Sequence, residues 1–228
     1  MPVDLKALEE DLRPTGLILR GGFDFRADET RPAGPCGEPA ASVVLIGNAG
    51  AGYWPVFMRW RETQPAGLAD PLDAWSRTVV EDVAETCRAR VIMPSDRPYA
   101  PFQRWAMRAE GLRPSPLGIL MHPDYGLWHA YRAALLFDVS LSARKGAGEP
   151  HASIHRCDLC VEKSCLNACP ADAFADDGFD HAACLSHVRS DAKPGCKDGC
   201  RARNACPHGH AYRYEAEVQR FHMDHFAR

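Results

Sequence analysis

The chain has no long apolar run and no excess of positive charge. None of its 228 residues belong to an apolar stretch near the roughly 18 residues that a membrane-spanning helix needs. Residues 1–10 are polar and acidic, which predicts that they are not a secretory signal peptide. The 27 Lys and Arg residues face 30 Asp and Glu residues, and the formal net charge of −3 does not attract nucleic acid. These absences favour a cytoplasmic protein without a membrane or nucleic-acid partner.

Cysteine is too sparse for a disulfide framework. Ten cysteines in 228 residues are about 4%, below the density of small secreted disulfide scaffolds. Cys36 and Cys87 stand apart from the other eight, which all lie between Cys157 and Cys206. Cys87 falls on the apolar stripe of a predicted helix, so we expect a buried thiol there. Cys36 lies on a Pro/Gly loop, where we expect a structural or free thiol.

The eight clustered cysteines form two groups that each end in Cys-Pro. The groups are Cys157-x2-Cys160-x4-Cys165-x3-Cys169-Pro170 and Cys184 with Cys196-x3-Cys200-x5-Cys206-Pro207. This pattern is typical of a ferredoxin-like module with two [4Fe–4S] clusters, in which the cysteine before each proline ligates the other cluster. One cluster is therefore predicted on Cys157, Cys160, Cys165 and Cys206, and the other on Cys169, Cys184, Cys196 and Cys200. The pattern indicates electron transfer.

Two features leave alternatives open. Four residues, 161–164, stand where the common bacterial run has two, so the pairing of individual cysteines is not fixed by the spacing. Zinc is the rival metal, because Cys₄ or Cys/His sites suit it and several histidines lie close by. These are His155, His181, His187 and His208. Zinc spacings, however, do not account for two Cys-Pro endings.

The preceding part of the chain has an α+β pattern. Helical spacing of apolar residues and strand-like apolar runs alternate along it. Asp70 is predicted to cap a helix that has Pro71 at its first position. Predicted helices cover 5–12, 71–87, 101–110 and 211–226, and predicted strands cover 16–23, 41–46, 90–93, 117–121 and 133–141. We expect an α+β domain over 1–142, a linker over 143–150, a ferredoxin-like module over 151–210 and a C-terminal helix over 211–228.

Three stretches of the first domain resemble the cobalamin-processing decyanase/dealkylase family of cobalamin C type. They are residues 5–17, residues 41–47 and the His122-Pro-Asp-Tyr-Gly-Leu-Trp-His-Ala-Tyr-Arg132 segment, which is similar to the family's His-Pro-x-x-Gly-x-Trp-x-x-x-Arg. The resemblance implies a flavin-reductase/nitroreductase-like sandwich that binds cobalamin with its lower base displaced. It implies cofactor contacts by His122, Tyr125, Trp128 and Arg132. Arg132 matches the arginine near the upper face of cobalt, which gives it a catalytic role.

The order of segments is also similar to that of epoxyqueuosine reductases and corrinoid reductive dehalogenases. In both, a corrinoid-binding sandwich precedes a two-cluster ferredoxin module. Residues 111–128 resemble the reductase run that ends Tyr-Gly-Ser-Trp, but Arg113-Pro-Ser-Pro-Leu-Gly replaces its Gly-Trp-x-Gly-Lys-Asn. The long segment that precedes this run in the reductases is missing too. A tRNA-modifying role is therefore the less favoured alternative.

The sequence predicts an iron–sulfur oxidoreductase that delivers electrons from two [4Fe–4S] clusters to cobalamin. An external low-potential electron donor protein would supply them. The alternative is a ferredoxin-like carrier whose first domain docks a partner or binds flavin. Simpler roles for individual residues also stay open at this point: Trp128 and Tyr131 as core aromatics, His122 as a turn residue, and Arg132 as a surface residue or the partner of an acid.

Overall fold

A computed structural model describes residues 3–141, 154–175, 178–190 and 194–228, and all structural statements concern these residues. The chain forms two compact units: unit 1 comprises 1–111 and 130–152, and unit 2 comprises 112–129 and 153–228. The predicted linker over 143–150 lies outside the described residues. The predicted domain boundaries stay a prediction, but residues 112–129 pack with the cysteine-rich region rather than with the rest of 1–142.

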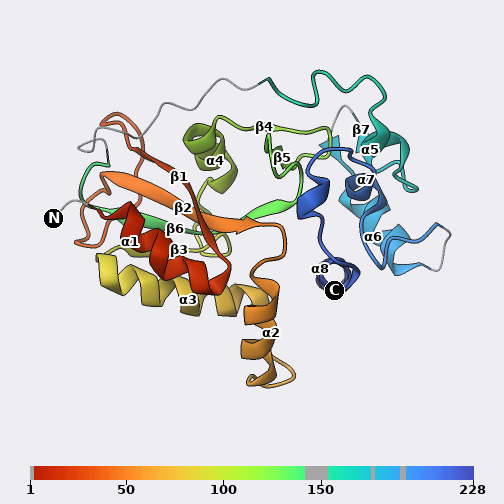
Figure 1. Cartoon of the computed structure of the whole chain (residues 1–228). Coiled ribbons are helices and arrows are strands. Elements are labelled where there is room, and N and C mark those ends of the chain that lie inside the picture. The colour runs from red at the N-terminus through yellow and green to blue at the C-terminus, as the bar shows by residue number, and fades with distance from the viewer. Residues whose placement is uncertain (1–2, 142–153, 176–177, 191–193) are drawn as a thin grey trace. The chain divides into compact units, whose positions relative to one another are not determined.

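Unit 1 is built on a four-stranded sheet (Figure 1). Its strands are β1 (Ile18–Asp24), β2 (Ser42–Ala49), β3 (Arg90–Ile92) and β6 (His129–Phe137), in the order β1-β2-β6-β3. β1 pairs antiparallel with β2, with an irregularity between Leu19 and Gly22, and β3 pairs antiparallel with β6. Seven of the eight residues of β2 are buried, as expected of an apolar strand that is covered on both faces.

Helices cover this sheet on both sides (Figure 1). They are α1 (Leu5–Leu12), α2 (Trp54–Glu62), α3 (Pro71–Cys87) and α4 (Phe102–Glu110), with a 3₁₀ turn at Arg13–Thr15. α1 packs against α3 and β1, and α4 packs against β1 from the other face. The Asp4 carboxylate accepts the backbone N–H groups of Lys6 and Ala7 and so caps α1. Unit 1 is therefore a mixed α/β layer structure, in keeping with the predicted α+β class.

Helix α3 differs from the predictions at two residues. Asp70 has a left-handed backbone (φ 43°), and its side chain makes no capping bond, although its carbonyl oxygen accepts the N–H groups of Asp73 and Ala74. Cys87, the last residue of the helix, is half-buried rather than buried.

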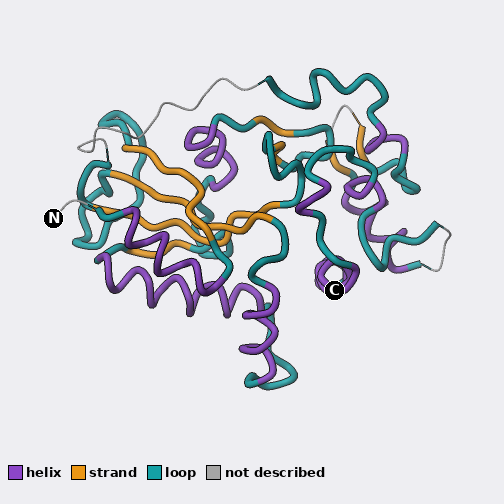
Figure 2. The backbone as a smooth tube through the Cα atoms, viewed as in Figure 1, coloured by secondary structure: helices purple, strands orange, loops and turns teal. Residues whose placement is uncertain are grey.

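The described part of unit 2 has strands of two residues and helices of four to eleven residues (Figure 2). They are β4 (Arg113–Pro114), β5 (Leu120–Met121), α5 (Ser164–Asn167), β7 (Phe174–Ala175), β8 (Gly178–Phe179), α6 (His181–Arg189), α7 (Arg201–Asn204), a 3₁₀ turn (His210–Tyr212) and α8 (Ala216–Phe226). Its apolar cluster joins Leu117, Met121 and Leu127 to cysteines. None of the helices in either unit's described residues is both long and apolar enough to span a membrane.

Two glycines let the backbone of residues 122–129 touch the backbone that follows Cys206. Gly126 has φ +57°, and a Cβ there would lie 2.3 Å from the carbonyl oxygen of His208. Gly209 has φ +74°, and a Cβ there would lie 2.2 Å from the carbonyl oxygen of Tyr125. Only glycine suits a left-handed conformation at so close a contact. The two segments are thereby held together as one structural unit.

Candidate functional site

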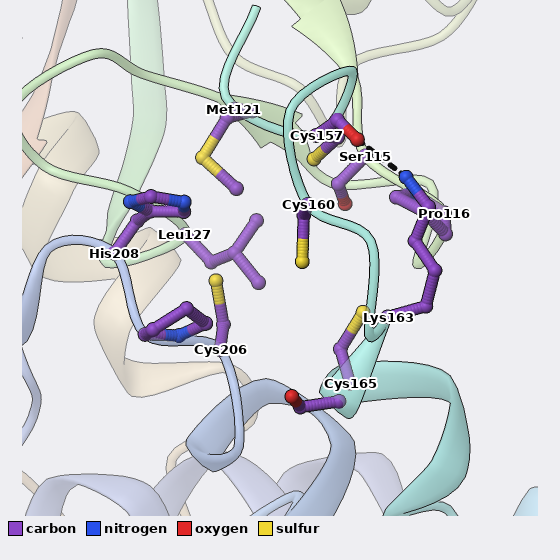
Figure 3. Close-up of a pocket in the computed structure, with 12 residues that line it drawn as sticks. Ser115, Pro116, Met121, Leu127, Cys157, Cys160, Lys163, Cys165, Cys206 and His208 are labelled. Carbon is purple, nitrogen blue, oxygen red and sulfur yellow. Dashed lines mark hydrogen bonds between the residues drawn. The ribbon is translucent and has the colours of Figure 1, made fainter.

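Four thiols from separated parts of unit 2 line one hollow (Figure 3). Cys157 and Cys160 lie on the loop before α5, Cys165 lies in α5, and Cys206 follows α7. We call these four cysteines the first set. The hollow has about 330 Å³ of atom-free space, part of it open to solvent. Met121 and Leu127 form its apolar wall.

The electrostatics of the first set shows that its thiols lie close together. Burial, together with the neighbouring Cys206, Cys165 and Cys160 and against the effect of Lys163, raises the pKa of Cys157 to about 11. Burial is also the main reason that the pKa values of Cys165 and Cys206 are raised. Raised pKa values keep these thiols protonated near neutral pH, and a bound cation would be needed for all four to ionise together.

The other four cysteines gather as a second set. Cys169 follows α5, Cys184 lies in α6, Cys196 is buried, and Cys200 is the N-cap of α7. Burial raises the pKa of Cys184 to about 11, and Cys200, Cys169 and Cys196 act in the same direction. The Cys169 sulfur accepts the N–H of Ala173 (3.4 Å), and the Cys200 sulfur accepts that of Arg203 (3.5 Å).

Each set contains one cysteine from the other Cys-Pro group of the sequence. Cys206, from the second Cys-Pro group, joins the three leading cysteines of the first group. Cys169, from the first group, lies among the cysteines of the second. The structure thus brings together the two foursomes that the sequence pattern suggested. Their role as cluster ligands stays a prediction.

Four thiols that line one hollow can serve two kinds of metal site. With Zn–S bonds of about 2.3 Å, two thiolates on one zinc lie only about 3.8 Å apart. A [4Fe–4S] cube takes one thiolate on each of four irons, so its thiolates stand farther apart around a central volume. Among the described residues, no three His, Cys, Asp or Glu side chains come close enough to hold one metal ion. Which of the two sites the first set forms stays a prediction.

Two of the neighbouring histidines lie against backbone carbonyl oxygens. The Nε2 atom of His155 lies 3.1 Å from the carbonyl oxygen of Arg113. His208 lines the hollow of the first set, and burial lowers the pKa of its imidazole. His181 and His187 both lie on α6, and the His187 Nε2 lies 3.0 Å from the carbonyl oxygen of Pro194.

The predicted cofactor residues His122 and Tyr125 form a turn. The His122 Nδ1 atom accepts the backbone N–H groups of Asp124 (3.0 Å) and Tyr125 (3.1 Å). The rings of His122 and Tyr125 stack with centroids 3.9 Å apart, and Tyr125 also packs edge-on against Tyr212. The simpler role of His122, as a turn residue, is therefore visible in the structure. Its cofactor role stays a prediction.

Trp128 is enclosed by its own unit. Its side chain is 0% exposed, the Arg203 guanidinium lies 4.3 Å from its ring centroid, and Tyr214 packs edge-on at 5.4 Å. Arg203 also donates two hydrogen bonds to the Leu127 carbonyl oxygen. The Trp128 indole N–H has no acceptor among the described residues. Trp128 thus serves as a core aromatic of unit 2, and its contact with a cofactor stays a prediction.

Arg132 belongs to unit 1, where an amide and a ring orient it. Its Nε donates to Asn48 Oδ1 at 3.0 Å, and its guanidinium lies 5.2 Å from the centroid of the Tyr53 ring. The side chain is half-buried and has no carboxylate partner in the described part of the chain. An oriented guanidinium without an acid can bind an anionic group.

Sequence reasoning missed a buried ion pair in unit 1. Arg20 is 1% exposed, and its Nε and Nη2 each donate to one oxygen of Glu110 at 2.8 Å. The Tyr131 hydroxyl donates to the same carboxylate, and burial raises the pKa of Tyr131. No pattern marks this pair, because an arginine on an alternating strand is usually exposed.

Comparison with known proteins gives a likeness of fold. No protein-family model and no curated protein sequence matches the chain. The structure of a C. elegans B12-trafficking protein, CblC, is similar with a TM-score of 0.56 and 13% identity, over 98% of this chain and 94% of that one.

Epoxyqueuosine reductases are also among the similar structures. The enzyme from Streptococcus thermophilus has a TM-score of 0.52 at 13% identity, over 90% of this chain and 65% of that one. The Bacillus subtilis enzyme has a TM-score of 0.47 at 14% identity, and this chain spans about half its length. At such identities the shared property is the mixed α/β fold of these two kinds of protein.

Proposed function

We propose that this chain is an iron–sulfur electron-transfer protein that reduces a corrinoid. In this proposal the first set (Cys157, Cys160, Cys165, Cys206) and the second set (Cys169, Cys184, Cys196, Cys200) each hold one [4Fe–4S] cluster. The observation that carries it is the gathering of eight cysteines into two foursomes with a crossed partner. The clusters would supply one-electron transfer.

Residues around both sets of cysteines have defined tasks in this proposal. Leu127 and Met121 exclude water from the hollow, and low polarity there strengthens every charge interaction. Backbone N–H groups at Ala173 and Arg203 donate to sulfurs of the second set, which stabilises negative charge on them. An external low-potential protein would supply the electrons.

The corrinoid part of the proposal rests on fold and on Arg132. The fold likeness to a B12-trafficking protein covers nearly the whole chain. Arg132, held by Asn48 and Tyr53, would bind an anionic leaving group or co-substrate with charge-assisted hydrogen bonds. The enzyme would then be an oxidoreductase acting on cobalamin. The net charge of −3 gives no support for a tRNA substrate.

The cluster assignment is tested by iron and sulfide analysis after anaerobic purification. The full chain should contain about eight of each, as two cubes require. Cys206→Ala and Cys165→Ala should each lose one cluster, and so should the double variant, because both residues serve the first set. Cys165→Ala with Cys169→Ala should lose both clusters. Cys36→Ala, which changes an exposed thiol outside both sets, is the control. Bound zinc without acid-labile sulfide would end the proposal.

The corrinoid assignment is tested with cob(II)alamin and the reduced, cluster-loaded protein. Binding should shift the absorbance to that of the base-off form, and cyano- or alkylcobalamin should be turned over. Arg132→Ala should keep both clusters and lose turnover, whereas Arg132→Lys should retain part of it because the charge remains. Turnover by Arg132→Ala equal to that of the unchanged chain would remove Arg132 from the mechanism. Binding of flavin in place of corrinoid would favour the alternative, a carrier with a flavin domain.

A further inference from the structure

Lys163 places a positive charge at the wall of the first set. It lies immediately before α5, in a left-handed backbone conformation with φ 45°. Its Nζ donates a hydrogen bond to the carbonyl oxygen of Cys157, so the ammonium group is held beside that ligand (Figure 3). The side chain lines the hollow together with Cys157, Cys160 and Cys165.

This charge lies beside the first set of thiols. Lys163 stands between Cys160 and Cys165 in the sequence and lines the same hollow as the first set. None of the four cysteines of the second set lines that hollow. The two sets therefore differ in electrostatic environment although their ligands are the same.

The difference has a direct consequence for electron transfer. Reduction adds one negative charge to a cluster, so a neighbouring ammonium stabilises the reduced state more than the oxidised one. The apolar wall of Met121 and Leu127 acts in the opposite direction, since it disfavours added charge. A cation held inside that wall offsets this cost.

We propose that Lys163 raises the reduction potential of the cluster at the first set, so that this cluster accepts electrons from the one at the second set. The inference rests on the proposed function. In the step, one electron leaves the reduced cluster of the second set and enters the oxidised cluster of the first, with no proton transferred. A low-potential donor protein restores the second cluster. In this inference Lys163 acts through the reduction potential of the cluster at the first set, and so it sets the direction of electron transfer between the two clusters.

The test is a redox titration of the full, cluster-loaded chain, with the two clusters followed by electron paramagnetic resonance. Lys163→Gln removes the charge and keeps an N–H donor for the Cys157 carbonyl. We expect it to lower the potential of one cluster so that its reduced-to-oxidised ratio at a fixed potential falls about tenfold, which is 59 mV for one electron. Lys163→Arg should restore the potential. Lys197→Gln removes an exposed charge next to Cys196 and should leave the first cluster's potential unchanged.

The outcomes separate this inference from the proposed function. Two clusters in Lys163→Gln with unchanged potentials, or equal shifts of both clusters, would overturn the role of Lys163 and leave the clusters in place. A purified chain without iron and sulfide would overturn both. Should Lys163→Gln fail to load, Lys163→Asn serves instead, because asparagine tolerates the left-handed backbone. A selective shift in that variant supports the inference, and its absence refutes it.

Discussion

The two units reach a stable fold by different means. Unit 1 has a four-stranded sheet, a 17-residue helix and fully buried side chains such as Trp75 and Leu45. Unit 2 has strands of two residues, and only α6 and α8 exceed four residues among its helices. Two of the six residues of its buried apolar cluster are cysteines, and three more cysteines pack against it. Unit 1 thus has an ordinary apolar core, whereas unit 2 places reactive thiols where a core would be.

Removal of the proposed clusters should alter unit 2 much more than unit 1, which is the largest effect that we expect. After chelation, peptides from α5, α6 and α7 should lose protection from hydrogen exchange, because eight thiols then lack their neutralising partner. Peptides from β2 and α3 should stay protected. Hydrogen exchange of the loaded and chelated full chain, followed by mass spectrometry, measures both. Equal loss of protection in β2 and α6 would contradict the contrast between the units.

The buried ion pair of unit 1 should have the next largest effect. Arg20→Met leaves the Glu110 carboxylate without its partner and should reduce the free energy of unfolding by about 3–5 kcal/mol. The control is Arg77→Met, which breaks a half-exposed pair with Asp96 and should cost no more than about 1 kcal/mol. Urea denaturation monitored by circular dichroism gives both values. Similar losses in the two variants would show that the Arg20–Glu110 pair stabilises the fold no more than the half-exposed Arg77–Asp96 pair does.

The close backbone contact at Gly126 in unit 2 is tested by a matched pair of substitutions. Gly126 and Gly118 both have a left-handed backbone, but only at Gly126 would a Cβ meet another atom, the His208 carbonyl oxygen. Gly118→Ala should therefore cost about 1 kcal/mol, and Gly126→Ala should exceed it by about 1–3 kcal/mol. Thermal denaturation of the loaded protein measures the difference. Equal costs would mean that the close contact does not stabilise unit 2.

The smallest effect that we expect is the pH dependence of the stability of the cluster-free chain. Cys157 and Cys184 have pKa values of about 11 in the folded chain, above the value of 9.0 for an unperturbed thiol. Between these values the folded cluster-free chain binds more protons than the unfolded chain, so its stability is full below about pH 9 and falls as the pH rises to about 11. Melting of the cluster-free chain at several pH values measures this slope. The Cys157→Ser, Cys184→Ser double variant should show a smaller slope, and an identical slope would exclude these thiols.

Periodic patterns were predictable, and long-range polar contacts were not. The continuous apolar run of β2 and the leucine spacing of α1 predicted their elements, because local sequence decides both. The two cysteine foursomes followed from the Cys-Pro endings. Lys163, by contrast, lies in the four-residue spacing that departed from the common run, and only the fold shows that it faces the first set. The Arg20–Glu110 pair joins residues 90 positions apart, which no local pattern reports.

The sequence also could not show that residues 112–129 pack with unit 2 rather than with unit 1. Residues 112–129 precede β6 and looked like part of the first domain, yet their apolar side chains Leu117, Met121 and Leu127 pack with the cysteines. Their partners lie 30 to 90 residues farther along the chain. The sequence places these residues before the predicted linker, whereas their apolar side chains pack with cysteines of unit 2.

That discontinuity decides how the protein can be taken apart. A fragment that ends at residue 142 contains the loop of residues 112–129 but none of the cysteine region against which Leu117, Met121 and Leu127 pack. Those three side chains would then face water as one apolar patch, which promotes aggregation. A soluble fragment of unit 1 instead calls for a short polar bridge that joins Gly111 to Ala130. Along the chain, the first part of unit 2 is inserted within unit 1, and the rest of unit 2 follows unit 1. The two units are therefore not simply consecutive domains joined by a linker.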